Sequence, residues 1–230
     1  MIKKAITFSF DDGKTQDRRL IDIMNKYGLK GTFNLNSGTL GLKGESVHGK
    51  KIVNRTTVKH SEIKNLYNGH EVASHTLLHP NLTEQDNDAI IWQVETDTKL
   101  LSNLMGYEVV GFAYPCGGVN NDERVAKIIK NNTGVKYART ITDTYSFDPQ
   151  DNLLRFNPTV YYTKYEKMIE LAEKFLKMQT ESFSLFYIWG HSYELDIGEG
   201  INWEKFEDFC KLISNHKDIF YGTNKEILLK

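Results

Sequence analysis

The sequence predicts an α/β fold in which about seven mostly parallel strands alternate with helices. Short runs of β-branched and aromatic residues recur along the chain, and segments with apolar residues at helical spacing separate them. Each helical segment can serve as the crossover between two parallel strands. The 230 residues contain no internal repeat or low-complexity linker, so we expect one domain over residues 1–230. This alternation fits either a closed barrel or an open, doubly wound sheet.

The first half of the chain predicts three strands, three helices and one long loop. In order, these are a strand at 4–10 (KAITFSF), a helix at 15–27 followed by Gly28, a strand at 30–35, a Gly-rich loop at 36–57, a helix at 60–68, a strand at 70–75 (HEVASH), and a helix at 84–105 with Thr83 as its N-cap. The loop is long enough to be functional, and we expect it, with His48 and Arg55, to shape a substrate groove.

The second half continues the alternation to the end of the chain. The expected elements are a strand at 109–114 (VVGFAY), a helix at 121–132 capped by Asn120 or Asn121, strands at 135–139 (VKYAR) and 153–157 (LLRFN), a helix at 164–178, a strand at 184–189 (SLFYIW), a helix at 203–214, a strand at 219–221, and a short last helix. The residues from Thr223 to Glu226 fit a capping box at the start of that helix.

Composition argues against several classes of protein. The net charge is −1 and the basic residues are scattered, which argues against a nucleic-acid partner. No apolar run approaches the roughly 20 residues of a membrane span, and AITFSF is shorter than the roughly 7–15 residue core of a signal peptide. Two cysteines, Cys116 and Cys210, are too few for a disulfide framework. We therefore expect a cytoplasmic protein.

Residues with catalytic chemistry follow several of the predicted strands. Asp11 and Asp12 end the first strand, SHTLLHP supplies His75 and His79, YPCGG follows the strand at 109–114, and WGHSYEL supplies His191. Because the carboxyl ends of parallel strands share one edge of a sheet, we expect these segments to meet there. No GxGxxG or Walker-type loop follows the first strand, which argues against nucleotide binding.

The residue types predict a metal-assisted hydrolase. His75, His79 and one of the two aspartates make a three-ligand set that leaves a divalent ion open to water or substrate. The other aspartate could act as the general base, and His191 as the acid that protonates the leaving group. Each segment alone has a structural interpretation: Asp-Asp-Gly as a turn, HxxxH as a surface pair and His191 as a packing residue. Their coincidence at strand ends favours the catalytic one.

Four motifs, in order, resemble those of the NodB-type polysaccharide deacetylases, carbohydrate esterase family 4. They are TFSFDDG, SHTLLHP, FAYPCGG and YIWGHSYEL, and the resemblance spans residues 6 to about 195. It implies a distorted (β/α) barrel of about seven parallel strands with its site at the strand carboxyl ends. It also implies Asp12, His75 and His79 as metal ligands, Asp11 as the general base, His191 as the general acid, and the backbone N–H of Cys116 as an oxyanion donor. Tyr114 and Trp189 are expected to line the pocket.

Two positions depart from the family pattern. Many members have an arginine at the position of Ala113, where it orients the base aspartate, and alanine cannot do this. Arg139 and Arg155 are candidates to replace it, and either could instead be a structural arginine. Cys116 stands where an aromatic residue is usual, and a backbone role survives that change.

The resemblance implies hydrolysis of N-acetyl or O-acetyl groups on a sugar or oligosaccharide, with Zn²⁺ as the expected metal and Co²⁺, Ni²⁺ or Mn²⁺ as alternatives. Two other functions stay open at this point. The same metal site could hydrolyse a non-sugar amide or cyclic imide, or the chain could be a catalytically impaired relative that binds carbohydrate. The sequence does not identify the oligomeric state.

Overall fold

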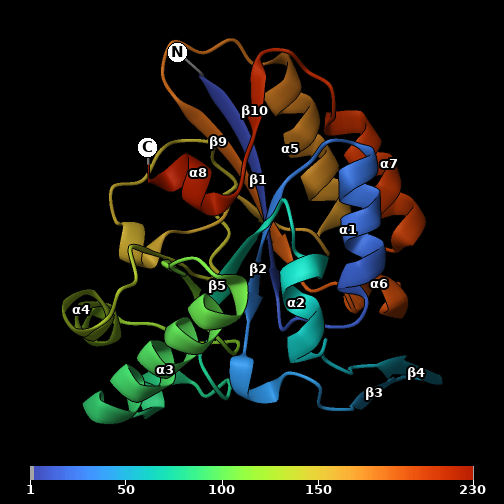
Figure 1. The fold of residues 1–230 in the computed structure, drawn as a ribbon. Coiled ribbons are helices and arrows are strands. Elements are labelled where there is room, and N and C mark those ends of the chain that lie inside the picture. Colours follow the sequence, from blue (N-terminus) through green and yellow to red (C-terminus); the bar gives the residue numbers. More distant parts are fainter. Residues whose placement is uncertain (1–2, 230) are drawn as a thin grey trace.

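The centre of the molecule is a sheet of eight parallel strands curled into a distorted barrel, as the computed structural model of residues 3–229 shows (Figure 1). The strand order is β7-β6-β5-β2-β1-β9-β8, with β10 also paired to β1. The strands are β1 (Lys4–Asp11), β2 (Gly31–Leu35), β5 (Glu71–Ser74), β6 (Gly111–Ala113), β7 (Tyr137–Arg139), β8 (Val160–Tyr161), β9 (Ser184–Gly190) and β10 (Ile219–Tyr221). The predicted distorted parallel barrel is confirmed.

Strand β1 lies at the middle of this sheet. Its first residues pair with β10 and its last residues, Phe8 to Asp11, pair with β2, whereas β9 runs along the other side. Asp11 therefore ends the central strand at the carboxyl edge of the barrel, where polar groups from neighbouring strands can reach it.

The segment from Phe156 to Tyr161 joins β7, at one edge of the sheet, to β9. Phe156 exchanges backbone hydrogen bonds with the β7 region, and Thr159 donates its N–H to Tyr187 in β9. The strand predicted at 153–157 is wrong, because residues Leu153–Arg155 form a 3₁₀ helix. Pro158 has no N–H for a strand ladder, which limits the pairing here to an isolated bridge at Phe156 and the two residues of β8.

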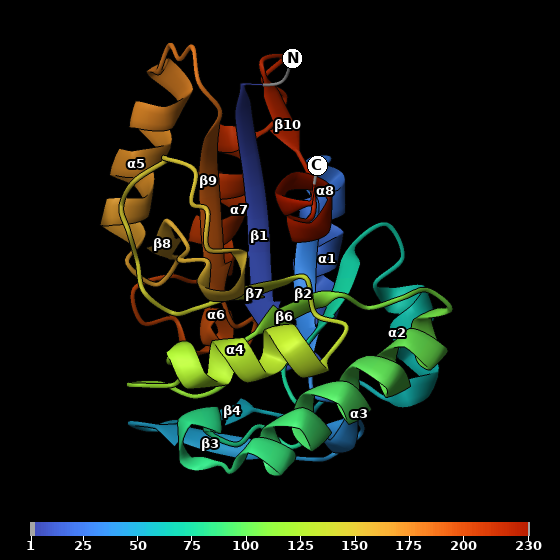
Figure 2. The ribbon, with the colours of Figure 1, turned by 90° about the vertical axis from the view of Figure 1, so that its left-hand side faces the viewer.

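Helices cover the outside of the barrel (Figure 2). They are α1 (Asp17–Lys26), α2 (His60–Leu66), α3 (Asn87–Met105), α4 (Glu123–Asn132), α5 (Tyr165–Lys177), α6 (Glu194–Ile197), α7 (Trp203–Ile213) and α8 (Asn224–Leu228). The sequence did not indicate α6. Within residues 3–229, no helix combines the length and the apolar composition that crossing a membrane requires.

Two predicted helix caps are wrong and one is confirmed. Asp86, not Thr83, caps α3 by accepting a hydrogen bond from the Ala89 N–H. Similarly, Asp122 rather than Asn120 or Asn121 caps α4. An aspartate at the N-cap accepts from the helix amides and also complements the positive end of the helix dipole. The capping box that opens α8 at Thr223 is present as predicted.

The predicted irregular loop at 36–57 is largely ordered, which corrects the sequence interpretation. It holds a 3₁₀ turn at Ser37–Thr39 and an antiparallel hairpin of β3 (Glu45–His48) and β4 (Lys51–Asn54). The hairpin turns at Gly49, whose φ of +60° suits a tight turn that glycine adopts without steric cost. It projects from the end of the molecule at which the carboxyl ends of β1 and β2 lie (Figure 1).

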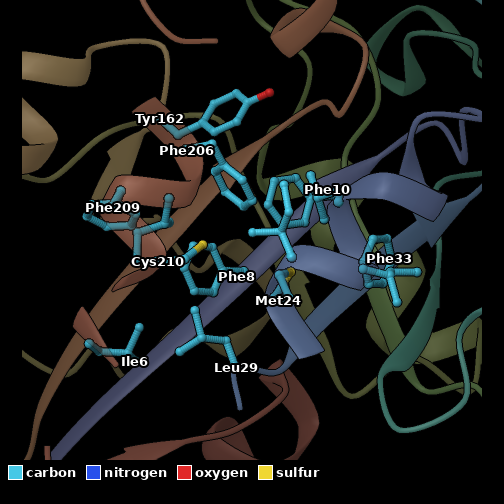
Figure 3. Close-up of a cluster of buried hydrophobic side chains, with 14 of the residues drawn as sticks. Ile6, Phe8, Phe10, Met24, Leu29, Phe33, Tyr162, Phe206, Phe209 and Cys210 are labelled. Atoms are coloured by element: carbon cyan, nitrogen blue, oxygen red, sulfur yellow. The ribbon is translucent and has the colours of Figure 1, made fainter. Parts of the chain in front are cut away.

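The largest hydrophobic cluster lies between the sheet and the helices on one side of it. Ile6, Phe8 and Phe10 of β1 point into this cluster, where Phe206 and Phe209 of α7 meet them (Figure 3). The alternate residues of β1 carry polar groups that bond inside the barrel, among them Asp11. Alternation along one strand thus buries aromatic rings on one face and delivers a carboxylate from the other.

Candidate active site

A pocket of about 470 Å³ opens at the carboxyl edge of the barrel. All the chemically capable strand ends predicted from the sequence meet there. They contribute Asp11, Asp12, His75, His79, Cys116 and His191 to its lining. Tyr114 and Trp189, which were expected to line the pocket, also do so.

Asp12, His75 and His79 form a compact group of three metal-ligating side chains. Their ligand atoms all lie within 4.8 Å of one another. The Asp12 Oδ1 atom is 3.8 Å from His75 Nε2 and 3.5 Å from His79 Nε2. His75 Nδ1 lies 2.8 Å from the Ala113 carbonyl oxygen, so this nitrogen carries the proton and Nε2 presents its lone pair to the group. Two neutral imidazoles and one carboxylate at this spacing fit a divalent ion.

Backbone strain is concentrated around this group. Asp12, Thr76, His79 and Cys116 all have positive φ, between +62° and +77°. Such conformations cost on the order of 1–3 kcal/mol each for residues other than glycine, and Thr76 is also β-branched. These positive-φ conformations turn each segment sharply away from the direction of its strand. Side chains from separate strand ends can therefore converge on one point.

Asp11 is buried and held by two donors. Its carboxylate accepts hydrogen bonds from Asn34 Nδ2 at 2.7 Å and from Arg139 Nη2 at 2.7 and 2.5 Å. Burial alone would raise the pKa of Asp11, but the positive charge of Arg139, with smaller contributions from His75 and His191, outweighs it and lowers the pKa. Asp11 is therefore ionised, and its oxygen atoms have fixed positions.

Arg139 lies beside Ala113 in the sheet. The two residues are register partners in the neighbouring strands β6 and β7, so the arginine reaches Asp11 from one strand further along the sheet. Its side chain is 0% exposed, and its guanidinium lies over the Trp189 ring at 4.6 Å. Arg155 is not brought to Asp11, because it bonds to Asn121 and Glu123 at the surface instead.

His191 directly follows β9, the neighbour of β1, and its imidazole lies near Asp11. Its Nε2 atom lies 3.9 Å from Asp11 Oδ2, and its backbone carbonyl accepts a 2.5 Å hydrogen bond from Tyr162. Burial lowers the pKa of His191, although Asp12 and Asp11 oppose this shift. Its Nδ1 atom is 3.2 Å from Glu194 Oε1 without the alignment of a hydrogen bond, and it has no such partner among the described residues.

Several residues at the site were not assigned a role from the sequence. Asn34 is the register partner of Asp11, and an amide side chain near the end of the predicted strand 30–35 was the available signal. Glu194 follows His191 by three residues and accepts hydrogen bonds from the His191 N–H and Tyr161 hydroxyl. Burial raises its pKa to about 8. Of the two loop residues expected near the groove, Arg55 lines the pocket, whereas His48 bonds to Ser46 in the hairpin.

The remaining predicted pocket residues have defined contacts. Trp189 stacks on Tyr161 with ring centroids 4.2 Å apart and is 6% exposed, so little of its ring area is available to a ligand. Tyr114 is buried and donates its hydroxyl proton to the Leu154 carbonyl oxygen. The Sγ atom of Cys116 lies 3.7 Å from His79 Nδ1. Among residues 3–229, no protein acceptor bonds to the Cys116 N–H.

Comparisons with known proteins indicate the family of the chain. The family model described as polysaccharide deacetylase matches residues 1–138. The chain is 30% identical over 119 residues to the peptidoglycan-N-acetylglucosamine deacetylase PgdA of Listeria monocytogenes, covering 51% of this chain and 22% of that protein. It is 28% identical over 120 residues to a bifunctional xylanase/deacetylase of Pseudobutyrivibrio xylanivorans, covering 52% of this chain and 18% of that protein. The chain thus spans about a fifth of the length of these relatives.

A solved structure extends the likeness over the whole fold. The Xyl-CE4 domain of a multidomain xylanase, from the hindgut metagenome of Trinervitermes trinervoides, superposes with a TM-score of 0.60 at 18% identity. The alignment covers 99% of this chain and 90% of that one. At 18% identity, this likeness shows a shared fold and nothing about function. The family model covers more than half of the chain and includes three of its four motif segments. The chain belongs to the polysaccharide deacetylase family.

Proposed function

We propose that the chain is a metal-dependent hydrolase that removes acetyl groups from N-acetylated or O-acetylated carbohydrate. One observation carries the proposal: Asp12, His75 and His79 converge within 4.8 Å, and the separate pair Asp11 and His191 lines the same pocket. A purely binding site has no need of a metal group, a base and an acid together. The names of the curated relatives, which describe deacetylases, support the same reaction.

Asp12, His75 and His79 would hold the divalent ion. When bound, such an ion lowers the pKa of water and polarises a carbonyl group. The proposed metal is Zn²⁺, since two imidazoles and a carboxylate suit it, with Co²⁺, Ni²⁺ or Mn²⁺ as alternatives. His75 is prepared for this role, because its bond to Ala113 fixes the ring orientation before any ligand arrives.

Asp11 is the proposed general base that accepts a proton from the attacking water. Its carboxylate is ionised, and Arg139 and Asn34 hold it in place. Correct positioning of a base contributes roughly 10²–10⁴-fold to such a reaction. Arg139 is thus the proposed replacement for the arginine absent at Ala113.

Cys116 is proposed to stabilise the oxygen that gains negative charge, and His191 is proposed to protonate the leaving group. Cys116 lines the pocket, its N–H has no protein acceptor among residues 3–229, and it would donate to the oxygen that gains negative charge. His191 would pass a proton from Nε2 to the leaving nitrogen or oxygen, after which the carbon–nitrogen or carbon–oxygen bond breaks and acetate leaves. Glu194 accepts a hydrogen bond from the His191 N–H and would hold this residue in place.

Acetate release from N-acetylglucosamine oligomers and acetylated xylan tests the proposal. The wild type should release acetate after Zn²⁺ or Co²⁺ is added and lose this activity on treatment with a chelator. Asp11→Asn and His79→Ala should each reduce turnover by at least about 10²-fold. His48→Ala is the matched control, because His48 bonds within the hairpin and should leave turnover unchanged. Activity that persists in Asp11→Asn would exclude the assignment.

A further inference from the structure

Arg55 places a guanidinium group on the wall of the pocket, beside residues of two of the motif segments. It follows β4, and its backbone N–H bonds to Gly44, which ties it to the base of the hairpin. The Cζ atom lies 3.4 Å from the centroid of the Tyr193 ring, and Nη2 lies 3.4 Å from Asp12 Oδ2. Both Arg55 and Tyr193 line the pocket.

This guanidinium is held in place and can still take a ligand. The cation–π contact with Tyr193 fixes its position, and 27% of the side chain stays exposed. A guanidinium carries five N–H donors, of which the long hydrogen bond to Asp12 uses one and a side-chain hydrogen bond to Tyr193 uses a second. Tyr193 lies beside His191, with ring centroids 5.3 Å apart, so the arginine is close to the groups proposed to act on substrate.

Arg55 shares its carboxylate partner, Asp12, with a second cation, Lys14. Arg139 already matches Asp11 in a buried pair. Lys14 Nζ lies 3.9 Å from Asp12 Oδ2, and a divalent ion held by Asp12 would more than neutralise that carboxylate. The contact between Arg55 and Asp12 is therefore not an exclusive pair, and the guanidinium stays partly exposed. A partly exposed guanidinium on a pocket wall is suited to binding a carboxylate or a phosphate through two parallel hydrogen bonds.

We propose that Arg55 and Tyr193 form an anion subsite, and that the pocket selects acetylated sugars carrying a carboxylate or phosphate group. This inference rests on the proposed deacetylase function for its substrate class. The subsite selects by charge, so it distinguishes acidic sugars from neutral ones of the same ring structure.

Binding measured by titration calorimetry tests the subsite without relying on turnover. The probes are N-acetylglucosamine as the neutral sugar, N-acetylmuramic acid as the carboxylate, and N-acetylglucosamine 6-phosphate. At low salt, the wild type should bind at least one acidic sugar roughly tenfold more tightly than the neutral one. Arg55→Gln should lose that preference and keep its affinity for the neutral sugar, whereas Arg55→Lys should retain part of it. Comparing the two acidic probes identifies which anion the subsite takes.

Arg19→Gln is the matched control, because Arg19 also places a guanidinium over an aromatic ring, that of Trp203, on the outer surface. It should keep the full preference for acidic sugars. Equal affinity of the wild type for all three sugars, or an equal loss for all three in Arg55→Gln, would overturn the subsite. Acetate release from the same sugars separates the two proposals. A charge preference in binding without acetate release would remove the deacetylase function and leave the subsite standing.

Discussion

Replacement of Arg139 by glutamine should strongly destabilise the protein. The Arg139 side chain is 0% exposed, the Asp11 side chain is 2% exposed, and the ion pair joins them at 2.5 Å. Removing one member of a buried pair leaves an uncompensated charge and costs about 3–5 kcal/mol. For a chain of this size, that loss lowers the thermal midpoint by roughly 10 °C. Asn34 still donates to Asp11 in the variant, which places the expected loss toward the lower end of the range.

The same substitution at Arg155 is the control. Arg155 pairs with Glu123 at 2.5 Å, but the two side chains are 32% and 81% exposed. Solvent-exposed ion pairs contribute about 0–1 kcal/mol to stability, so Arg155→Gln should barely change the thermal midpoint. Arg139→Gln should also lose most acetate release, because Asp11 would no longer be held in place, whereas Arg155→Gln should keep it.

A double-mutant cycle isolates the Asp11–Arg139 pair. The double variant Asp11→Asn/Arg139→Gln removes both charges. Its loss of unfolding free energy should therefore be smaller than the sum of the two single losses, by at least about 2 kcal/mol. Thermal and urea denaturation of the four proteins give these values. Additive losses, or equal effects of Arg139→Gln and Arg155→Gln, would refute the reasoning that the buried pair is a coupled unit.

The remaining predictions concern the metal group, the strand that carries His191, and a buried carboxyl group. Asp12→Asn should lose most bound Zn²⁺ in equilibrium dialysis, whereas Asp11→Asn should retain it; equal metal contents would contradict the division of roles. Gly190→Ala should lower stability by about 1–3 kcal/mol in thermal unfolding, because a Cβ at this position would overlap the Tyr162 ring, and an unchanged midpoint would show that the strand relaxes. Burial raises the pKa of Asp97 to about 7, so the unfolded chain loses this proton at lower pH than the folded one. The stability of the wild type relative to Asp97→Asn should therefore fall by about 1.4 kcal/mol per unit as pH rises from about 4 toward 7, and a difference independent of pH would show that Asp97 titrates normally.

The sequence by itself determined the architecture and the main chemical groups. Alternating strand and helix patterns predict a parallel sheet, and parallel strands bring their carboxyl ends to one edge. That rule was enough to place Asp11, Asp12, His75, His79 and His191 around one pocket without any knowledge of the contacts. The helix caps and the hairpin were predicted less well, because neighbouring polar residues compete for each cap and the 36–57 segment that contains the hairpin is rich in glycine.

Only the tertiary structure decided which residues support those groups. Arg139 and Arg155 were equivalent candidates in the sequence. Strand register places Arg139 beside Ala113 and therefore against Asp11, whereas Arg155 lies on a 3₁₀ helix at the surface. Arg55 reaches the pocket because the hairpin folds toward Tyr193, 138 residues further along the chain. Contacts between distant segments depend on register and packing, and these properties are not encoded in the local pattern of either segment.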